Sequence, residues 1–318
     1  MRVLVTGGAG FIGSNLVGAL LLDERIRFVR VMDNLATGSL TNISSYRNDP
    51  RFEFMEADIR DFEQCMKACE GIDAISHQAA LGSVPRSIDD PITTNNVNIT
   101  GALNVFTAAN KQGIKRIVYA ASSSTYGDHA ALPKVEDRIG RPLSPYAITK
   151  YVNELYAQVY ADLFQMEPIG LRYFNIFGPR QNPKGAYAAV IPLFAQALID
   201  HKPPKINGDG RHSRDFTYVD NAVQANILAL FTENKEAVNQ VYNIACGQQT
   251  SLNELFQHLR EQAGTDLQPI HGPERKGDVL HSLADITKAK NLLGYEVKVS
   301  VEEGLKKTFD WYKEKLSC

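Results

Sequence analysis

The feature that most constrains the fold is a glycine-rich turn between a short strand-like run and the start of a helix. Residues 2–6 form that run, and the motif Gly7-Gly8-Ala9-Gly10-Phe11-Ile12-Gly13 follows at once. Gly7 permits a tight turn, Gly10 lets the backbone approach a diphosphate, and Gly13 lets the helix pack against the strand. Asp33 ends the next apolar run, twenty residues after Gly13. This spacing predicts a βαβ unit that binds a dinucleotide.

The first half of the chain alternates short apolar strands with amphipathic helices, which is typical of a parallel sheet covered on both faces. Ser144-Pro145 is a clear helix start, with a hydroxyl N-cap and then proline at the first helical position. We therefore predict an α/β fold built on a doubly wound parallel (Rossmann) sheet. The expected strands are residues 3–6, 28–33, 52–57, 74–77, 117–121 and 170–174, and the expected helices begin near Gly10, Phe62, Asn95 and Pro145.

Beyond residue 175 longer loops separate the helices, which we expect near residues 187–200, 220–231 and 252–262. We interpret residues 175–318 mainly as a smaller, interleaved α/β lobe over the carboxyl ends of the strands, where doubly wound folds bind ligands. Residues 241–244 have the pattern of a strand that returns to the main sheet. The predicted dinucleotide-binding domain therefore comprises residues 1–174, with returning segments near 216–247.

The composition limits the classes of partner. A formal net charge of -2 over 318 residues provides no overall field that would recruit nucleic acid or an anionic membrane. Cys65 and Cys69 lie one helical turn apart, but no histidine or further cysteine is near enough to complete a zinc site, so no metal is expected. The chain shows neither a signal-peptide pattern nor an apolar run of membrane-spanning length. We expect a cytoplasmic protein with reduced thiols.

The expected dinucleotide is NAD. Asp33 can accept hydrogen bonds from both adenosine ribose hydroxyls and would repel the 2′-phosphate of NADP. Asp58 and Ile59, after the third strand, are placed to meet the adenine edge, although Asp58 could instead cap a turn. The segment Gln78-Ala79-Ala80, after the fourth strand, would let the backbone approach the diphosphate. His77 just before it is better explained as a buried structural histidine than as a catalytic base.

Tyr146 and Lys150 lie one turn apart on the same face of the helix that follows the fifth strand. A tyrosine with its reference pKa of about 10 is a poor base, but a neighbouring ammonium and a positive nicotinamide ring would lower that pKa. Ser122, at the end of the fifth strand, can hydrogen-bond a reacting hydroxyl and pass its proton to Tyr146. Ser123, the next residue, is a further candidate catalytic residue, and we assign Ser124 to hydrogen bonds with backbone groups at the strand end. This combination predicts hydride transfer between NAD and a sugar alcohol.

Together, the glycine motif, Asp33-Asn34, the serine cluster, the Tyr146/Lys150 pair and Tyr173-Phe174-Asn175 resemble the extended short-chain dehydrogenase/reductase superfamily over essentially the whole chain. Residues 82–87, 185–192 and 277–282 resemble the bacterial UDP-N-acetylglucosamine 4-epimerases of surface-polysaccharide synthesis. The resemblance implies oxidation of the sugar at carbon 4 by tightly bound NAD. The 4-keto sugar then rotates about its link to the anchored diphosphate, and the hydride returns to the other face.

The resemblance also assigns residues. Asn175, Arg214 and Arg275 would hold the diphosphate, although Arg214 could instead form an ion pair with Asp215. Asp278 would hold the uridine ribose, and Ala189, Val190 and Asn207 would surround the uridine. The sugar would meet Ser83, Ser122, Ser123, Tyr146 and Ser282, and the further cofactor contacts would be Phe11, Ile12, Asn34, Gly38, Asn95, Lys150 and Tyr173.

Three alternatives bear on this assignment. Related dehydratases carry acidic residues after the strand-end hydroxyl, where this chain has Ser123 and Ser124, so dehydration is not expected. Ser282, four residues after Asp278, leaves room for an N-acetyl group and favours UDP-GlcNAc and UDP-GalNAc; the alternative is a UDP-glucose/UDP-galactose 4-epimerase. A protein of another class, a dinucleotide-binding sensor without turnover, also has this fold, but an intact Tyr146/Lys150 pair is unusual for one.

A homodimer is expected as well. The helices that begin near Asn95 and Pro145 carry more apolar faces than one sheet can cover, with Leu103, Phe106, Leu155 and Val159 among them. Members of the family that this chain resembles pair these helices in a four-helix interface, and we predict the same arrangement here.

Overall fold

A seven-stranded, wholly parallel sheet forms the centre of the protein. The computed structural model describes residues 1–183, 188–274 and 280–316. The strand order is β11-β6-β5-β4-β1-β2-β3, the doubly wound order with one strand added beside β6. The strands are β1 (Arg2–Thr6), β2 (Phe28–Asp33), β3 (Phe52–Glu56), β4 (Ala74–His77), β5 (Arg116–Ser122), β6 (Glu167–Tyr173) and β11 (Gln240–Ile244).

Helices cover both faces of this sheet, as predicted. Side chains that alternate along the strands enter two separate cores: Val3 and Val5 pack into one, and Leu4 into the other. The first core also receives α1 (Phe11–Leu22) and α8 (Val219–Phe231), and the second receives α2 (Phe62–Cys69), α5 (Ala102–Lys111) and α6 (Pro145–Phe164). The predicted doubly wound α/β fold is therefore confirmed, including the return of residues 241–244 to the sheet as part of β11.

Local sequence explains where the helices begin. Ser144 caps α6 by accepting a hydrogen bond from the Ala147 amide at 3.1 Å, with Pro145 in the first turn. The helix expected to begin near Asn95 begins earlier, as α4 (Pro91–Asn95), and continues through a π-helical turn (Asn96–Gly101) into α5. Asp90 caps α4 by accepting a hydrogen bond from the Thr93 amide at 3.0 Å, so this cap and Pro91 set the start of the helix earlier than predicted.

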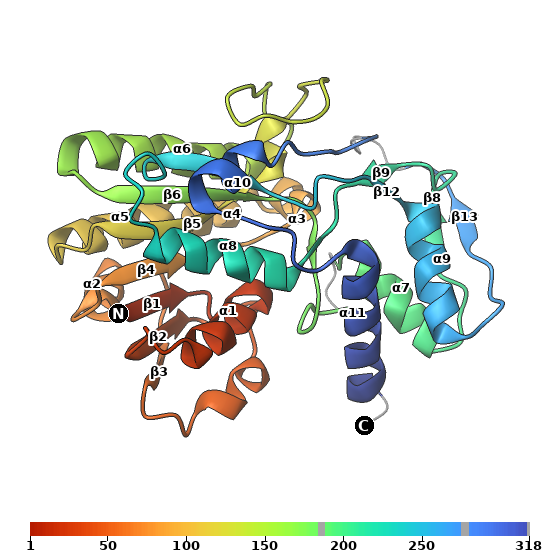
Figure 1. Ribbon diagram of the computed structural model, residues 1–318, viewed down its shortest axis with the longest axis horizontal. Helices are drawn as coiled ribbons and strands as arrows, with labels where there is room; N and C mark the ends of the chain where they lie inside the picture. Colours follow the sequence, from red (N-terminus) through yellow and green to blue (C-terminus); the bar gives the residue numbers. More distant parts are fainter. Residues whose placement is uncertain (184–187, 275–279, 317–318) are drawn as a thin grey trace.

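The smaller group of elements lies at one end of the molecule, where Figure 1 shows α7 (Val190–Ile199), α9 (Leu252–Ala263), β8 (Lys205–Asn207) and β13 (Ile270–Gly272) side by side. The helix α11 (Val301–Leu316), which the sequence did not predict, packs against α7 and α9. Short strand pairs join this group to the sheet: β7 (Ile176–Phe177) with β10 (Thr217–Tyr218), and β9 (Ser213–Arg214) with β12 (Thr250–Ser251). Two further short helices are α3 (Val84–Asp89) and α10 (Thr287–Leu293).

Two negative findings apply to the described residues, 1–183, 188–274 and 280–316. No helix among them is both long and apolar enough to cross a membrane. They also contain no cluster of three or more His, Cys, Asp or Glu side chains suited to a metal ion. Cys65 and Cys69 are buried and free, with pKa values raised by burial to about 12, which makes them unreactive thiols.

Candidate active site

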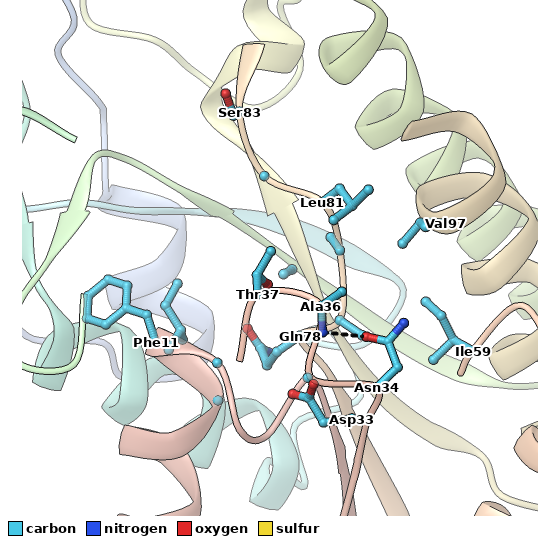
Figure 2. A pocket seen from close by; sticks show the side chains of 18 of the residues that line it. Phe11, Asp33, Asn34, Ala36, Thr37, Ile59, Gln78, Leu81, Ser83 and Val97 are labelled. Carbon is cyan, nitrogen blue, oxygen red and sulfur yellow. Dashed lines mark hydrogen bonds between the residues drawn. The ribbon is translucent and has the colours of Figure 1, made fainter. Parts of the chain in front are cut away.

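A cavity of about 560 Å³ lies along the carboxyl ends of the strands. Figure 2 shows Asp33, Asn34 and Ile59 at one end of it and Ser83 toward the other. The structure brings most of the predicted cofactor and catalytic residues, and two predicted substrate residues (Ser83 and Asn175), into this one lining. They are Gly7, Gly10, Phe11, Ile12, Gly13, Asp33, Asn34, Asp58, Ile59, Gln78, Ala79, Ala80, Ser83, Ser122, Tyr146, Lys150, Tyr173 and Asn175.

The glycine turn forms a cradle that side chains would fill. Gly7 has φ +70°, and a Cβ there would lie 2.6 Å from the Ala79 nitrogen. A Cβ at Gly13 would lie 2.2 Å from the Gly7 oxygen, so only glycine lets α1 pack this closely. Gly10 caps α1 without a side chain, which leaves the amides of the first turn open to the cavity. These residues fit a diphosphate held at a helix N-terminus.

Asp33 stands where the adenosine ribose of a dinucleotide would lie. One carboxylate oxygen accepts from the Ala9 amide at 2.9 Å and the other from the Leu35 amide at 2.8 Å. Each oxygen keeps a second acceptor site for a ribose hydroxyl. Burial raises the pKa of this carboxyl, against the opposing effect of the two amides. The residues at this end therefore fit NAD.

Asp58 caps a turn and also lines the cavity, so its contact with the adenine edge stays a prediction. Its carboxylate caps a turn, since it accepts from the Arg60 amide at 2.8 Å and pairs with the Arg60 guanidinium at 2.6 Å. It also lines the cavity and accepts from the Asn34 amide group at 2.8 Å. The hydrogen bond from Arg60 lowers the pKa of Asp58 to about 2, so this group stays ionised.

The opposite end of the cavity carries the reactive groups. Lys150 is almost fully buried, and its Nζ donates to the Ala120 carbonyl at 2.7 Å. The same Nζ lies 6.0 Å from the centre of the Tyr146 ring. Ser122 ends β5, and its Oγ lies 2.8 Å from the Ser124 Oγ and accepts from the Ser124 amide. A hydroxyl, a phenol and an ammonium therefore line the same cavity.

The pKa values at this end correct one expectation. Burial raises the pKa of the Tyr146 hydroxyl, and only a hydrogen bond with Ser122 opposes that shift. Burial also lowers the pKa of Lys150 to about 8, against the charge of Glu154. Without NAD, burial of the phenol therefore sets the direction of the shift in the Tyr146 pKa, and the lowering that we expected from Lys150 does not prevail. The positive nicotinamide ring of bound NAD would supply a charge that favours the phenolate.

A second cavity of about 720 Å³ adjoins the first and shares Ser83, Asn175, Ile176 and Gln181 with it. The predicted substrate residues Ala189, Val190, Asn207 and Arg214 line it. Arg214 Nη1 donates to the Ser213 carbonyl at 3.0 Å and the Leu280 carbonyl at 3.2 Å, which fixes the guanidinium beside the cavity. The buried Asp215 carboxylate accepts from the backbone amides of Cys246, Gly247 and Ala284.

Several predicted residues lie elsewhere. Within residues 1–183, 188–274 and 280–316, Gly38, Asn95, Ser123 and Ser282 line neither cavity. Asn95 is exposed at the end of α4, Ser123 opens the 3-10 turn after β5, and the Ser282 amide donates to the Ser213 carbonyl at 3.1 Å. Gly38 instead packs against the glycine turn, and a side chain at this position would place its Cβ 2.9 Å from the Ala9 carbonyl carbon. Arg275 and Asp278 fall outside the described residues.

His77 lies beneath the site and not in its wall. Its Nδ1 is 2.7 Å from the Thr6 hydroxyl, and burial lowers its pKa to about 3. A ring that stays neutral and lines neither cavity of the described chain supports the structural interpretation over a catalytic base.

Other lining residues were missed. Thr37 follows Asp33 in the same loop, so the strand-end argument could have included it. Thr93 and Val97 come from α4 and the turn after it, and α4 begins earlier than the sequence predicts. Gln181 reaches the cavity from a distant loop, and no local pattern marks it.

Comparison with known proteins identifies the family. Residues 3–245 match the model of the NAD dependent epimerase/dehydratase family. A putative UDP-glucose 4-epimerase of Methanocaldococcus jannaschii is 38% identical over 98% of both chains. The structure is similar to that of the Thermotoga maritima UDP-glucose 4-epimerase with UDP-glucose (TM-score 0.92, 38% identity, 99% of this chain and 100% of that one). It is also similar to the UDP-N-acetylglucosamine 4-epimerase of Methanobrevibacter ruminantium in complex with UDP-N-acetylmuramic acid (TM-score 0.93, 36% identity, 99% and 98%).

The protein therefore belongs to the NAD dependent epimerase/dehydratase family. Its cofactor is NAD, in agreement with the prediction from Asp33.

Proposed function

We propose that this protein is a 4-epimerase that interconverts UDP-GlcNAc and UDP-GalNAc with tightly bound NAD. One observation carries the proposal. Ser122, Tyr146 and Lys150 line the same cavity as the glycine cradle, and that cavity shares lining residues with the one that Arg214 lines. A hydride acceptor and a diphosphate anchor would thus lie on either side of a single proton-transfer group.

The mechanism follows from the positions of these groups. The glycine turn and Asp33 would hold NAD, which would supply reversible hydride transfer at carbon 4. Ser122 is placed to hydrogen-bond the 4-hydroxyl and Tyr146 to take its proton, as a general base. Lys150, held by the Ala120 carbonyl, keeps a positive charge near the phenol. The same two hydroxyls would return the proton when the keto group is reduced.

Epimerisation also needs an anchor that stays still while the sugar turns. Arg214 and Asn175 lie where they can hold the diphosphate, with Asn207, Ala189 and Val190 around the uridine. Guanidinium groups bind phosphate through strong, charge-assisted hydrogen bonds. The sugar would rotate at the junction of the two cavities, beside Ser83. Arg275 and Asp278 remain proposed ligands of the same anchor.

The second candidate is a UDP-glucose/UDP-galactose 4-epimerase. The names of the Methanocaldococcus and Thermotoga relatives support it. The acetylated substrate rests on the segments that resemble UDP-N-acetylglucosamine 4-epimerases and on the likeness to the Methanobrevibacter enzyme. A Ser282→Tyr variant should selectively lose the acetylated activity, and equal loss on both substrate pairs would contradict the role predicted for Ser282 from the sequence.

We also propose the predicted domain division and a homodimer. The packing of α8 on the main sheet and the pairing of β11 with β6 inside that sheet support a first domain of residues 1–174 with returning segments. The helix α6 exposes Ile148, Leu155, Val159 and Leu163, which recur at helical spacing on one face. A second copy of α5 and α6 would cover this face in a four-helix interface.

The test uses the purified protein without added NAD. It is incubated with UDP-GlcNAc and separately with UDP-glucose, and the products are separated chromatographically. We expect UDP-GalNAc to form faster than UDP-galactose, and Tyr146→Phe to abolish both reactions while NAD stays bound. Faster UDP-galactose formation would favour the second candidate. No product from a protein that holds NAD would favour a sensor, and a dehydrated 4-keto product would indicate a dehydratase.

A further inference from the structure

A closed ring of hydrogen bonds lies behind the reactive end of the cavity. The Tyr173 hydroxyl donates to Gln78 Oε1 at 3.0 Å, Gln78 Nε2 donates to Asn226 Oδ1 at 2.9 Å, and Asn226 Nδ2 donates to the Tyr173 oxygen at 2.7 Å. Gln78 follows β4, Tyr173 ends β6, and Asn226 lies on α8. Elements far apart in the sequence therefore meet in one ring.

Every polar atom of the Asn226 amide is used. Its oxygen also accepts from the Ser76 hydroxyl at 3.1 Å, and its nitrogen also donates to the Ala222 carbonyl at 2.8 Å. Because a carbonyl can only accept, Ala222 fixes which end of the amide is Nδ2. Oδ1 must then face Gln78, and the Gln78 oxygen must face Tyr173. One backbone carbonyl thus sets the direction of the whole ring.

The ring supports the nicotinamide end of the cofactor site and not the adenosine end. Tyr173 pairs with Ser122 in the register of β5 and β6, and both residues line the cavity near Lys150. Gln78 lines the same cavity between this end and the glycine turn. Its backbone N–H donates to the Thr6 carbonyl, just before that turn. Asp33 and Asp58, which face the adenosine half, lie at the end of β2 and just after β3. In the sheet, β1 separates these two strands from β4, β5 and β6. Asn226 itself is fully buried and lines neither cavity of the described chain.

We propose that Asn226 is a positioning residue for the nicotinamide half of NAD, acting through the ring that holds Gln78 and Tyr173 in the cavity wall. The proposal rests on the NAD-binding part of the proposed function and not on epimerisation. An orphaned amide or phenol would otherwise be free to turn into the space that the nicotinamide needs, since buried polar groups seek partners.

The test compares two ligands that share the adenosine diphosphate half. The tightly bound nucleotide is first removed from the full-length chain by reversible treatment with denaturant. The dissociation constants of NAD and of ADP-ribose, which lacks the nicotinamide, are then measured by calorimetry. We expect Asn226→Leu to weaken NAD binding about tenfold and to change ADP-ribose binding less than about twofold. Equal weakening of both ligands, or unchanged NAD binding, would overturn the proposal.

The same helix provides a matched control. Asn221 is equally buried on α8, but its amide bonds Lys298 and Val299, away from the cavity. Asn221→Leu should lower the thermal stability while leaving the ratio of the two dissociation constants unchanged. If Asn226→Leu does not fold, Tyr173→Phe opens the same ring without removing the amide and should lower NAD affinity selectively. An unchanged ratio in Tyr173→Phe would equally contradict the proposal.

Discussion

The Arg172 guanidinium binds both oxygens of the Glu154 carboxylate, from Nε at 2.9 Å and from Nη2 at 2.7 Å. Both side chains are more than nine-tenths buried, and the pair joins β6 to α6 one helical turn after Lys150. Arg172 also donates to the Glu136 carbonyl at 2.8 Å and lies over the Tyr126 ring. The pair therefore fixes α6, and with it Lys150, against the sheet.

Arg172→Met should destabilise the protein strongly, because it leaves the Glu154 charge buried without a partner. Breaking such a pair typically lowers the free energy of unfolding by about 3–5 kcal/mol. The double variant Arg172→Met with Glu154→Met should recover most of that loss, since neither charge then remains. Urea unfolding at saturating NAD measures both effects.

An exposed ion pair serves as the control for this prediction. Lys306 and Asp310 are 2.7 Å apart on α11 and both solvent-exposed. Lys306→Ala should change the free energy of unfolding by less than about 1 kcal/mol. A double Arg172/Glu154 variant as unstable as the single one would show that the pair contributes packing and not charge compensation.

Ser122→Ala and Ser124→Ala should separate two neighbouring serines by function. Ser122 lines the cavity and hydrogen-bonds Tyr146, whereas Ser124 bonds Ser122 and lines neither cavity of the described chain. We expect Ser122→Ala to lower kcat about 100-fold or more, the usual range for a proton-transfer group. Ser124→Ala should lower it only a few-fold. The kcat of both variants is measured by steady-state kinetics on the preferred UDP-sugar. Equal losses would contradict the assignment of the proton relay to Ser122.

The sequence was sufficient where local pattern and chemistry agree. The glycine motif predicts β1, the turn and α1 because the backbone around Gly7 and Gly13 leaves no room for a side chain. Ser144 and Pro145 likewise set the start of α6 through a cap and a fixed φ. The positions of Tyr146 and Lys150 in one cavity follow from that helix and from the parallel topology.

Tertiary packing decided the rest. Asn226 meets Tyr173 across 53 residues of chain, and no local pattern marks that contact. The direction of the Tyr146 pKa shift depends on how much of the phenol is buried, which the sequence does not express. Ser282 was placed in the sugar pocket by its spacing from Asp278, but its amide pairs with the Ser213 carbonyl and its side chain lines neither cavity of the described residues.

Charges on the exposed face of α6 should dissociate the proposed dimer. Leu155→Glu with Val159→Glu places two carboxylates in the centre of the predicted four-helix interface, where a second copy would desolvate them. We expect a monomer in sedimentation at a concentration where the wild-type protein is dimeric. Leu22→Glu is the control, since Leu22 is 87% exposed at the end of α1 and lies outside the proposed interface. An unchanged dimer in the α6 variant would contradict the interface.

The affinity for NAD should fall in mild acid because of Asp33. Burial raises the pKa of this carboxyl above its usual value near 4. The ribose hydroxyls donate to the ionised form, so NAD binding favours deprotonation. The dissociation constant should therefore be independent of pH above the raised pKa and should increase up to tenfold per pH unit below it. Asp58 does not titrate in this range, because its pKa is about 2.

Asp33→Asn isolates this effect, since the amide has nearly the same shape and does not titrate. Its NH₂ group would face the Ala9 or Leu35 amide, both donors, so binding should be weaker at every pH. Calorimetry from pH 4.5 to pH 8 should give a sloping curve for the wild-type protein and a flat one for the variant. If the dissociation constant depended on pH equally in the two proteins, a group other than Asp33 would control that dependence, because asparagine does not titrate.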